Sequence, residues 1–227
     1  MSLNTQIDAY APYRALKEHE MLMLKKVREL SHEKSTILDI GCADGLFISE
    51  LAKELPKAII TGIDISSKLI ATAKTKEFKN CSFFVEDAEK FKPNNKFDLI
   101  IASGILSVFD NFEWIINKWT SWLEDNGRLI IFGRFNSNDV DVKVSFRNNF
   151  KNSEWEGGLT SYSIKTVGRY LADLGYEYDF SKFTFSGDLA KSEDPIRTYT
   201  VNTEDGNKLI LNGANLVAEH FFLTIRN

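Results

Sequence analysis

The side chains best suited to chemistry are carboxylates that follow short apolar segments. Asp39 precedes the turn 41–45, which contains Gly41 and Gly45, and Asp64 ends the next apolar segment. Glycine lets the backbone approach a ligand closely because it lacks a Cβ atom. A carboxylate accepts hydrogen bonds from hydroxyl groups and attracts cations. A strand that ends in such a turn and leads into a helix is typical of nucleotide binding.

The spacing of the glycines argues against two phosphate-binding motifs. A dinucleotide-binding turn requires G-x-G-x-x-G, but with Gly41 as the first glycine the next two positions hold Ala43 and Leu46. The Gly-Lys-Ser/Thr sequence of a P-loop is also missing from this turn. The acids instead suit hydroxyl groups, an ammonium group or a sulfonium.

Strands and helices that alternate along the first half must position these acids. Near-continuous apolar strands of this kind predict a parallel sheet that is covered by helices on both faces. The expected strands are residues 36–40, 58–64, 81–85, 96–103 and 128–132, and the expected helices are 46–55, 66–76 and 112–123.

The two ends of the chain have other patterns. Residues 7–32 have helical periodicity, which Pro12 divides into a short and a longer helix. Residues 135–158 are polar and predict a loop with short helical pieces. The remaining expected elements are a helix at 163–174, a strand at 176–185, a hairpin at 197–211 and a strand at 221–225. The late strands predict an antiparallel edge on the sheet.

The composition of the chain argues against several classes of protein. The chain has 227 residues and a formal net charge of −4, which is a poor match for a general nucleic-acid binder. Cys42 and Cys81 show no metal-ligand spacing and no disulfide framework, and no apolar run approaches the length of a membrane span. With no secretion signal at its start, the chain is expected in the cytoplasm.

Several strand ends together resemble the class I S-adenosylmethionine-dependent methyltransferases of the small-molecule type. Residues 38–45 resemble motif I of that family, and residues 62–64 resemble the strand whose acid holds the ribose. Residues 86–88 resemble the loop that meets adenine, and 97–103 resemble the strand that ends beside the methyl group. Residues 123–129 resemble the turn into the fifth strand.

The resemblance implies an α/β fold, which is a Rossmann-like, doubly wound, seven-stranded and mostly parallel sheet with an antiparallel last strand. A single domain, 1–227, would comprise a helical cap (1–34), a cofactor-binding core (35–135) and a substrate-side part (136–227) with an inserted β-hairpin. S-adenosylmethionine would be the cofactor and S-adenosylhomocysteine the product. The implied cofactor-binding residues are Asp39, Gly41, Cys42, Ala43, Gly45, Asp64, Ile65, Asp87, Ala88, Ser103 and Gly104. Asp87 could alternatively cap a short helix at 88–91.

The acceptor side is less defined. Residues 103–111 match neither the Asp/Asn-Pro-Pro-Tyr/Phe signature nor the acid cluster of a Mg²⁺-dependent enzyme, which favours metal-independent transfer to an O or N atom of a small molecule. No general base stands out. The candidates for catalysis are His19, Tyr13 and Arg134, and His19 could instead simply pack along its helix face. The candidates for acceptor binding are Tyr10, Phe109, Arg134, Trp155, Arg197 and Tyr199.

Two other functions stay open. A methyltransferase that acts on tRNA or protein is supported only by the Lys-rich stretches 24–34 and 68–79, which are also typical of solvated helix faces. The other is a non-catalytic S-adenosylmethionine-binding protein or a degenerate fold, and the intact motifs argue against it. The expected partner is a small molecule and not nucleic acid or a membrane, and the chain would be a monomer or a homodimer.

Overall fold

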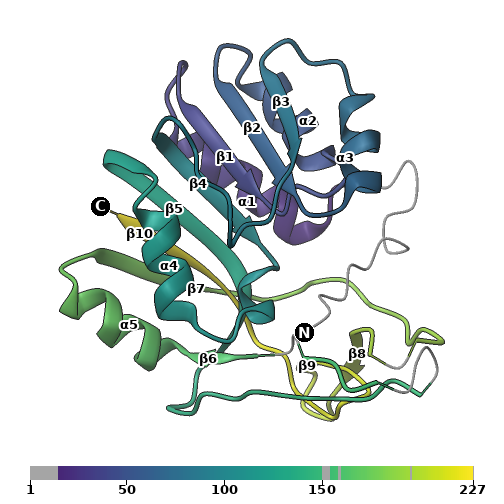
Figure 1. The fold of residues 1–227 in the computed structure, drawn as a ribbon. Coiled ribbons are helices and arrows are strands. Elements are labelled where there is room, and N and C mark those ends of the chain that lie inside the picture. The colour runs from purple at the N-terminus through teal and green to yellow at the C-terminus, as the bar shows by residue number, and fades with distance from the viewer. Residues whose placement is uncertain (1–14, 150–153, 158–159, 195, 227) are drawn as a thin grey trace.

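The computed structural model describes residues 15–149, 154–157, 160–194 and 196–226. A mixed sheet forms its centre, with the strand order β3-β2-β1-β4-β5-β10-β7 and the short β6 paired with β5 (Figure 1). The strands are β1 Thr36–Ile40, β2 Ile59–Asp64, β3 Cys81–Val85, β4 Phe97–Ser103, β5 Leu123–Asn136, β6 Tyr162–Ser163, β7 Glu177–Phe183 and β10 His220–Arg226. Neighbouring strands from β3 to β5 are parallel, as the alternation of elements predicts.

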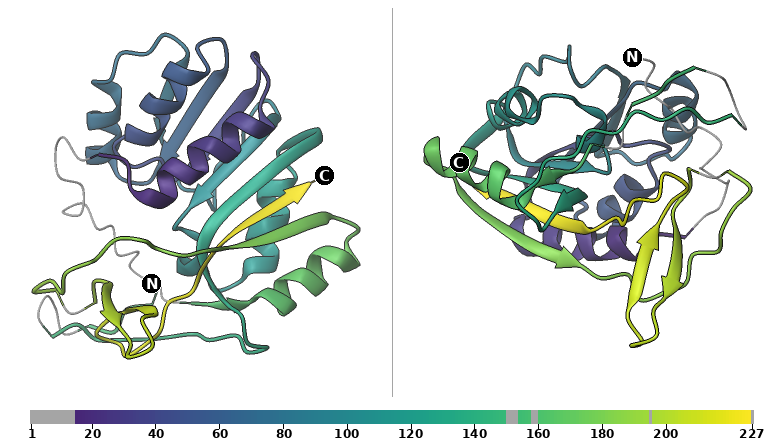
Figure 2. Two further views of the ribbon diagram at one scale, coloured as in Figure 1. Left: turned by 180° about the vertical axis from the view of Figure 1, so that it is seen from behind. Right: turned by 90° about the horizontal axis from the view of Figure 1, so that it is seen from below.

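Helices cover both faces of the sheet. They are α1 Glu18–Leu30, α2 Leu46–Glu54, α3 Ser67–Lys74, α4 Phe112–Thr120 and α5 Ile164–Asp173. Alternate residues of a strand point to opposite faces: Ile37 packs with α1 and α2 on one side, and Leu38 packs with α4 and α5 on the other. Figure 1 shows α4 in front of the sheet, and the view from behind in Figure 2 shows α1 in front. The predicted doubly wound, Rossmann-like α/β fold is confirmed.

Side-chain caps define where several helices begin. Ser66 accepts a hydrogen bond from the Leu69 backbone, and Ser163 accepts one from Lys165, at the starts of α3 and α5. Such a cap satisfies an otherwise unpaired backbone N–H group. At the other end of α5, Gly175 adopts φ +82°, a left-handed conformation that ends the helix.

The antiparallel strand lies inside the sheet and not at its edge. β10 pairs antiparallel with both β5 and β7, so β7 becomes the edge strand and runs parallel to β5. The predicted antiparallel last strand and the predicted antiparallel edge are both confirmed, because the sheet ends in the antiparallel pair β10–β7. Strand order across a sheet depends on contacts between distant segments, which the local pattern of a strand does not contain.

The polar segment after β5 forms bridges and no helix among its described residues. Val142 pairs with Ser161 and Phe146 pairs with Glu156 in isolated β-bridges, so the expected short helical pieces are wrong for the described part of 135–158. The predicted hairpin is present as β8 Tyr199–Asn202 and β9 Lys208–Leu211, apart from the main sheet (Figure 2, right). In the N-terminal part, α1 begins at Glu18, and residues 7–14 of the expected helix lie outside the described residues.

Candidate functional site

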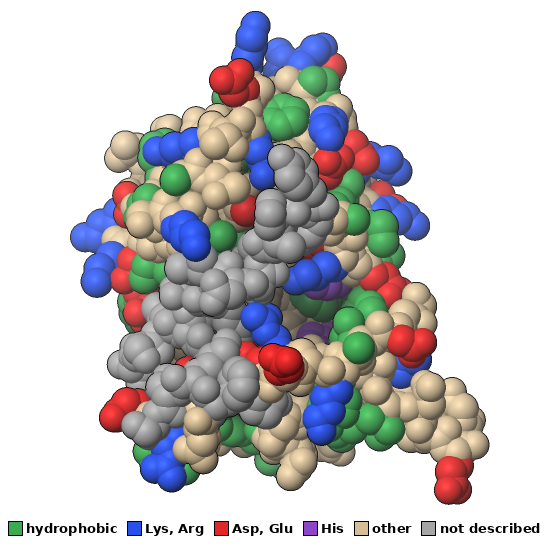
Figure 3. Space-filling model, turned by 90° about the vertical axis from the view of Figure 1, so that its right-hand side faces the viewer, with side chains coloured by type: hydrophobic (Ala, Val, Ile, Leu, Met, Phe, Trp, Pro, Cys, Tyr) green, Lys and Arg blue, Asp and Glu red, His purple; other side chains and the backbone are tan. Residues whose placement is uncertain are grey.

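A cavity of about 820 Å³ lies at the carboxyl ends of the central strands. Its walls come from the ends of β1, β2, β4 and β5, from the start of α1 and from the first residue of β10. Figure 3 shows histidine side chains on the floor of a hollow beside arginine and lysine side chains. In open α/β sheets, ligands bind in the crevice outside the carboxyl ends of the strands.

Asp39 forms the acidic end of this cavity. It is only 4% exposed, and it accepts no hydrogen bond from the described residues. Burial, with the nearby charges of Asp64 and Glu20 as smaller causes, raises the pKa of the Asp39 carboxyl to about 8. A buried carboxyl without a partner favours a cationic ligand, because a positive charge nearby stabilises its ionised form.

The turn after β1 is held in a left-handed conformation. Gly41, Ala43 and Gly45 have φ angles of +77°, +50° and +72°. Gly41 and Ala43 line the cavity, whereas Gly45 does not. At Gly45 a Cβ atom would lie 2.9 Å from the Cβ of Ala73, so this glycine permits close packing of α2 against α3.

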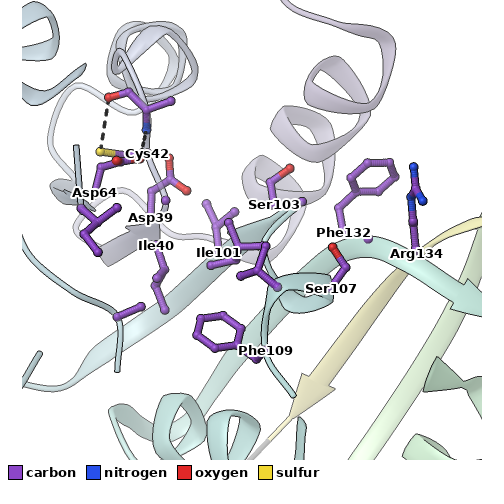
Figure 4. A pocket seen from close by; sticks show the side chains of 18 of the residues that line it. Asp39, Ile40, Cys42, Asp64, Ile101, Ser103, Ser107, Phe109, Phe132 and Arg134 are labelled. Carbon is purple, nitrogen blue, oxygen red and sulfur yellow. Dashed lines mark hydrogen bonds between the residues drawn. The ribbon is translucent and has the colours of Figure 1, made fainter. Parts of the chain in front are cut away.

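Asp64 ties the turn to the end of β2. One carboxylate oxygen accepts a hydrogen bond from the Ala43 backbone (3.0 Å) and the other accepts one from the Ser66 backbone (2.8 Å). Each carboxylate oxygen has room for a second donor. Asp64 also lines the cavity, as Figure 4 shows, so its two oxygens can receive a pair of ligand hydroxyl groups.

The loop after β3 brings a third acid to the same cavity. Asp87 and Ala88 line the cavity together with Ile65 from the loop after β2. The Asp87 carboxylate accepts a hydrogen bond from the Glu89 backbone (2.9 Å) and pairs with Lys90 (3.2 Å). It therefore caps a turn, although no helix forms at 88–91.

Ser103, the last residue of β4, and Gly104, which follows it, line the middle of the cavity. Gly104 has φ +74°, and no atom lies within 4 Å of the position of an added Cβ. The space above this backbone is therefore open to a ligand. Phe109, which follows the short helix Leu106–Val108, lines the next part of the wall.

Aromatic rings and one arginine form the opposite end. Phe132 and Arg134 rise from the same side of β5 in Figure 4, as residues two apart on a strand do. The ring of His19 stacks on Phe132 at 4.4 Å, and the ring of His220 stacks on it at 5.6 Å. Burial lowers the pKa of Arg134, and burial and the adjacent Arg134 charge lower the pKa of His220 to about 4. His220 therefore stays neutral near pH 7.

The cavity brings together many of the residues that the sequence singled out. The predicted cofactor residues that line it are Asp39, Gly41, Cys42, Ala43, Asp64, Ile65, Asp87, Ala88, Ser103 and Gly104. Among the other candidates, His19, Phe109, Arg134 and Arg197 also line it. Arg197 lies 3.8 Å from a carboxylate oxygen of Asp194.

Other candidates lie elsewhere. Trp155 is 68% exposed and faces Arg147 and not the cavity, and Tyr199 on β8 lies beside Lys191. Tyr10 and Tyr13 lie outside the described residues. Trp155 and Tyr199 sit on segments whose three-dimensional course no local motif indicates.

Glu20, Phe132 and His220 are among the lining residues that the sequence reasoning missed. Glu20 and Phe132 belong to patterns that fit an ordinary helix and an ordinary strand, so nothing local marks them. His220 could have been found only through its partner, because it lies directly opposite Arg134 in the register of β5 and β10.

Comparison with known proteins decides the family. Residues 31–170, more than half of the chain, match the family described as "Methyltransferase domain". The chain belongs to this family. The resemblance to the class I S-adenosylmethionine-dependent methyltransferases is thereby confirmed at the level of family and fold.

Curated relatives share parts of this methyltransferase domain. The chain is 33% identical over 128 residues to "Malonyl-[acyl-carrier protein] O-methyltransferase 2" of Ilyobacter polytropus, a match that covers 56% of this chain and 49% of the relative. It is 26% identical over 196 residues to "Trans-aconitate 2-methyltransferase" of Streptomyces avermitilis, covering 80% and 71% of the two chains. The chain thus spans about half the length of the malonyl-[acyl-carrier protein] relatives that it matches.

Solved structures share the fold over nearly the whole chain. A "DhpI-SAM-HEP complex" superposes with a TM-score of 0.64 at 14% identity, covering 98% of this methyltransferase domain and 92% of that chain. The N-methyltransferase NodS of Bradyrhizobium japonicum superposes with a TM-score of 0.56 at 19% identity, covering 99% and 98%.

Metal-binding clusters and membrane-spanning helices are both absent from the described part of the chain. No group of three or more His, Cys, Asp or Glu side chains there could hold a metal ion. None of the described helices is both long and apolar enough to cross a membrane.

Proposed function

We propose that this chain is an S-adenosylmethionine-dependent methyltransferase that transfers a methyl group to an O or N atom of a small-molecule acceptor. The observation that carries the proposal is the pair Asp39 and Asp64, which flanks the left-handed turn 41–45 at one end of the cavity. The pair offers a partner for a cation and a pair of acceptor oxygens for a ribose. Membership of the methyltransferase family supports the same interpretation.

The residues present fit this cofactor. Asp64 would accept hydrogen bonds from the ribose hydroxyls through the remaining capacity of its oxygens, and Asp87 and Ala88 would meet the adenine ring. The open backbone at Gly104 and the unpartnered Asp39 would receive the amino-acid part. When bound, S-adenosylmethionine supplies an activated methyl group on a sulfonium.

The protein's contribution is orientation and exclusion of water. Apolar side chains such as Ile101, Phe109 and Phe132 line the cavity around the end of β4, where the methyl group would lie. Positioning of this kind can contribute about 7–11 kcal/mol to lowering a barrier. We assign no general base. His19 lies on the cavity wall and stays a candidate together with Arg134.

Small acceptors fit the site better than macromolecules. The trans-aconitate 2-methyltransferase is named for a small acceptor, and the malonyl-[acyl-carrier protein] O-methyltransferase is named for a small acyl group that a protein carries. Figure 3 shows basic and acidic side chains interspersed around the hollow, whereas a nucleic-acid-binding face is usually predominantly basic. We further propose that the chain acts as a single domain in a reducing cytoplasm, a location that the two free cysteines support.

Calorimetry and a transfer assay test the proposal. S-adenosylmethionine and S-adenosylhomocysteine are titrated into the protein, and incorporation of labelled methyl groups is measured with metabolite fractions, bulk tRNA and protein. The expected result is saturable binding of both compounds and labelling of a small molecule. Binding of neither compound contradicts the proposed function, and labelling confined to tRNA or protein contradicts the proposed acceptor class.

A further inference from the structure

Arg134 is a cation without an anionic partner among the described residues. Its guanidinium lines the cavity, and among the described residues it makes no ion pair and no hydrogen bond. Burial alone accounts for the lowering of its pKa. A guanidinium has five donors in a planar fork, and removing it from water without a partner is costly. The arrangement is therefore incomplete until an anion binds.

The described neighbours of Arg134 on β5, β10 and α1 supply no anion. His220 lies opposite it across the β5–β10 pair, and the aromatic ring of Phe132 lies beside it on β5. His220 stays neutral because burial and the adjacent Arg134 charge oppose its protonation. His19, the next ring in the stack, is not anionic either.

Most acids that line the cavity lie at its other end, where the charge of Glu20 on α1 also acts on Asp39. Asp110, which also lines the cavity, pairs with Lys143. Asp39 and Asp64 belong to β1 and β2, and β4 separates β1 from β5. Neighbouring strands lie about 4.8 Å apart, so Arg134 is about 10 Å from the β1 side of the cavity. The cavity thus has an acidic end, which suits the cofactor's cationic part, and a basic end beyond the β4 terminus.

We propose that Arg134 binds a carboxylate of the methyl acceptor. This inference rests on the proposed function and specifies the substrate class of the same site. Arg197, the other arginine among the described residues that line the cavity, already lies 3.8 Å from Asp194, so Arg134 is the arginine of this wall that has no acidic partner among the described residues. One guanidinium matches one carboxylate in charge and in the geometry of two parallel hydrogen bonds, whereas a phosphate dianion would bring an additional negative charge into the site.

A carboxylate at Arg134 has two sources, the acceptor or the cofactor's own amino-acid part. The separation from Asp39 assigns it to the acceptor. Arg134→Gln and Arg134→Lys distinguish the two sources, with Arg169→Gln as a matched control. Arg169 is an exposed arginine of α5 that pairs with Asp139 (3.0 Å) and does not line the cavity.

Three small probes, which share a phenyl ring and differ in the attached polar group, take the place of the unidentified acceptor. Benzoate, benzamide and phenyl phosphate are titrated by calorimetry into wild type and variants, with and without saturating S-adenosylhomocysteine. S-adenosylhomocysteine is also titrated alone. Wild type is expected to bind benzoate more tightly than the other two probes. Loss of a charge-assisted contact should weaken benzoate binding about 10-fold to 100-fold in Arg134→Gln, and less in Arg134→Lys, which keeps the charge but loses the fork.

Two control affinities should stay at the wild-type value while the benzoate affinity of Arg134→Gln decreases. Arg169→Gln should bind benzoate as wild type does, and Arg134→Gln should bind S-adenosylhomocysteine as wild type does. A matching loss of S-adenosylhomocysteine affinity in Arg134→Gln overturns the proposal, because Arg134 would then hold the cofactor. The proposal is also overturned if the wild-type protein binds benzoate and benzamide equally, if it binds phenyl phosphate more tightly than benzoate, or if it shows no saturable binding of benzoate. If wild type fails to bind S-adenosylhomocysteine but its benzoate binding depends on Arg134, the proposed function fails and the anion site stands.

Discussion

Replacing Asp64 with alanine separates the ligand-binding role of this carboxylate from its structural role. Asp64 lines the cavity and accepts hydrogen bonds from the backbones of Ala43 and Ser66. In the proposed complex it would also accept two from the ribose. Hydrogen bonds to a charged group contribute about 1.5–3 kcal/mol each. Loss of two corresponds to about 3–6 kcal/mol, or about a 10²-fold to 10⁴-fold weaker affinity for S-adenosylhomocysteine.

The same substitution should also reduce stability, so a matched control is needed. The Asp98 carboxylate likewise accepts two hydrogen bonds, from the backbone and the hydroxyl of Thr36 (2.8 and 3.0 Å), at the other end of the sheet. It does not line the cavity. Asp64→Ala and Asp98→Ala should each lower the free energy of unfolding by about 1–3 kcal/mol, but only Asp64→Ala should weaken ligand binding.

The assay is calorimetric titration of S-adenosylhomocysteine at a temperature at which both variants remain folded by circular dichroism. Urea unfolding supplies the stability comparison. Unchanged affinity in Asp64→Ala refutes the placement of the ribose. An equal loss of affinity in Asp98→Ala also refutes it, because the effect would then follow from general destabilisation.

Three further predictions concern pH, backbone geometry and metal dependence. Because the pKa of Asp39 rises from 3.8 to about 8 on folding, the folded state binds more protons between these values, and the free energy of unfolding falls as pH rises from about 4 to about 8. Asp39→Asn should remove this loss. In urea unfolding, the free energy of unfolding of Asp39→Asn minus that of wild type should therefore increase from about pH 4 to about pH 8; a difference that stays constant with pH contradicts the reasoning. Gly45→Ala should lower the free energy of unfolding by about 1–3 kcal/mol more than Gly175→Ala does, because both glycines have positive φ but only Gly45 lacks room for a Cβ. Thermal unfolding measures the effect, and an equal decrease in the melting temperature of the two variants would contradict this. Methyl transfer should be unchanged by EDTA after dialysis, and a loss that Mg²⁺ restores would refute metal independence.

The cofactor side of the fold could be predicted because its signals are local. A strand, a turn with glycines and an acid at the strand end follow one another within a few residues, as in 36–45 and 59–64. Parallel strands bring their carboxyl ends to one edge, so Asp39, Asp64 and Asp87 were expected in one cavity, and all three line it. Their contacts with the cofactor stay a prediction.

The acceptor side could not be predicted to the same extent because its contacts are non-local. His220 meets Arg134 only because β10 pairs with β5, and neither segment alone indicates this pairing. Trp155 was a candidate as an aromatic residue in a polar segment, but the bridge between Phe146 and Glu156 fixes this segment and leaves Trp155 exposed. Residue type alone does not show whether such a side chain points inward.

The interior position of β10 has a consequence for the order in which the protein can assemble during synthesis. β7 pairs only with β10 among the described strands, yet β7 is made first. Until residues 220–226 leave the ribosome, β5 has an unpaired edge and β7 has no strand to join. At about 5–20 residues per second, the 37 residues from Phe183 to His220 (220 − 183) take about 2–7 seconds to add. β1 and β2, which carry Asp39 and Asp64, and β3, which precedes Asp87, are complete before this interval. The nascent chain can therefore form its nucleotide-facing half while the Arg134–His220 wall is still missing.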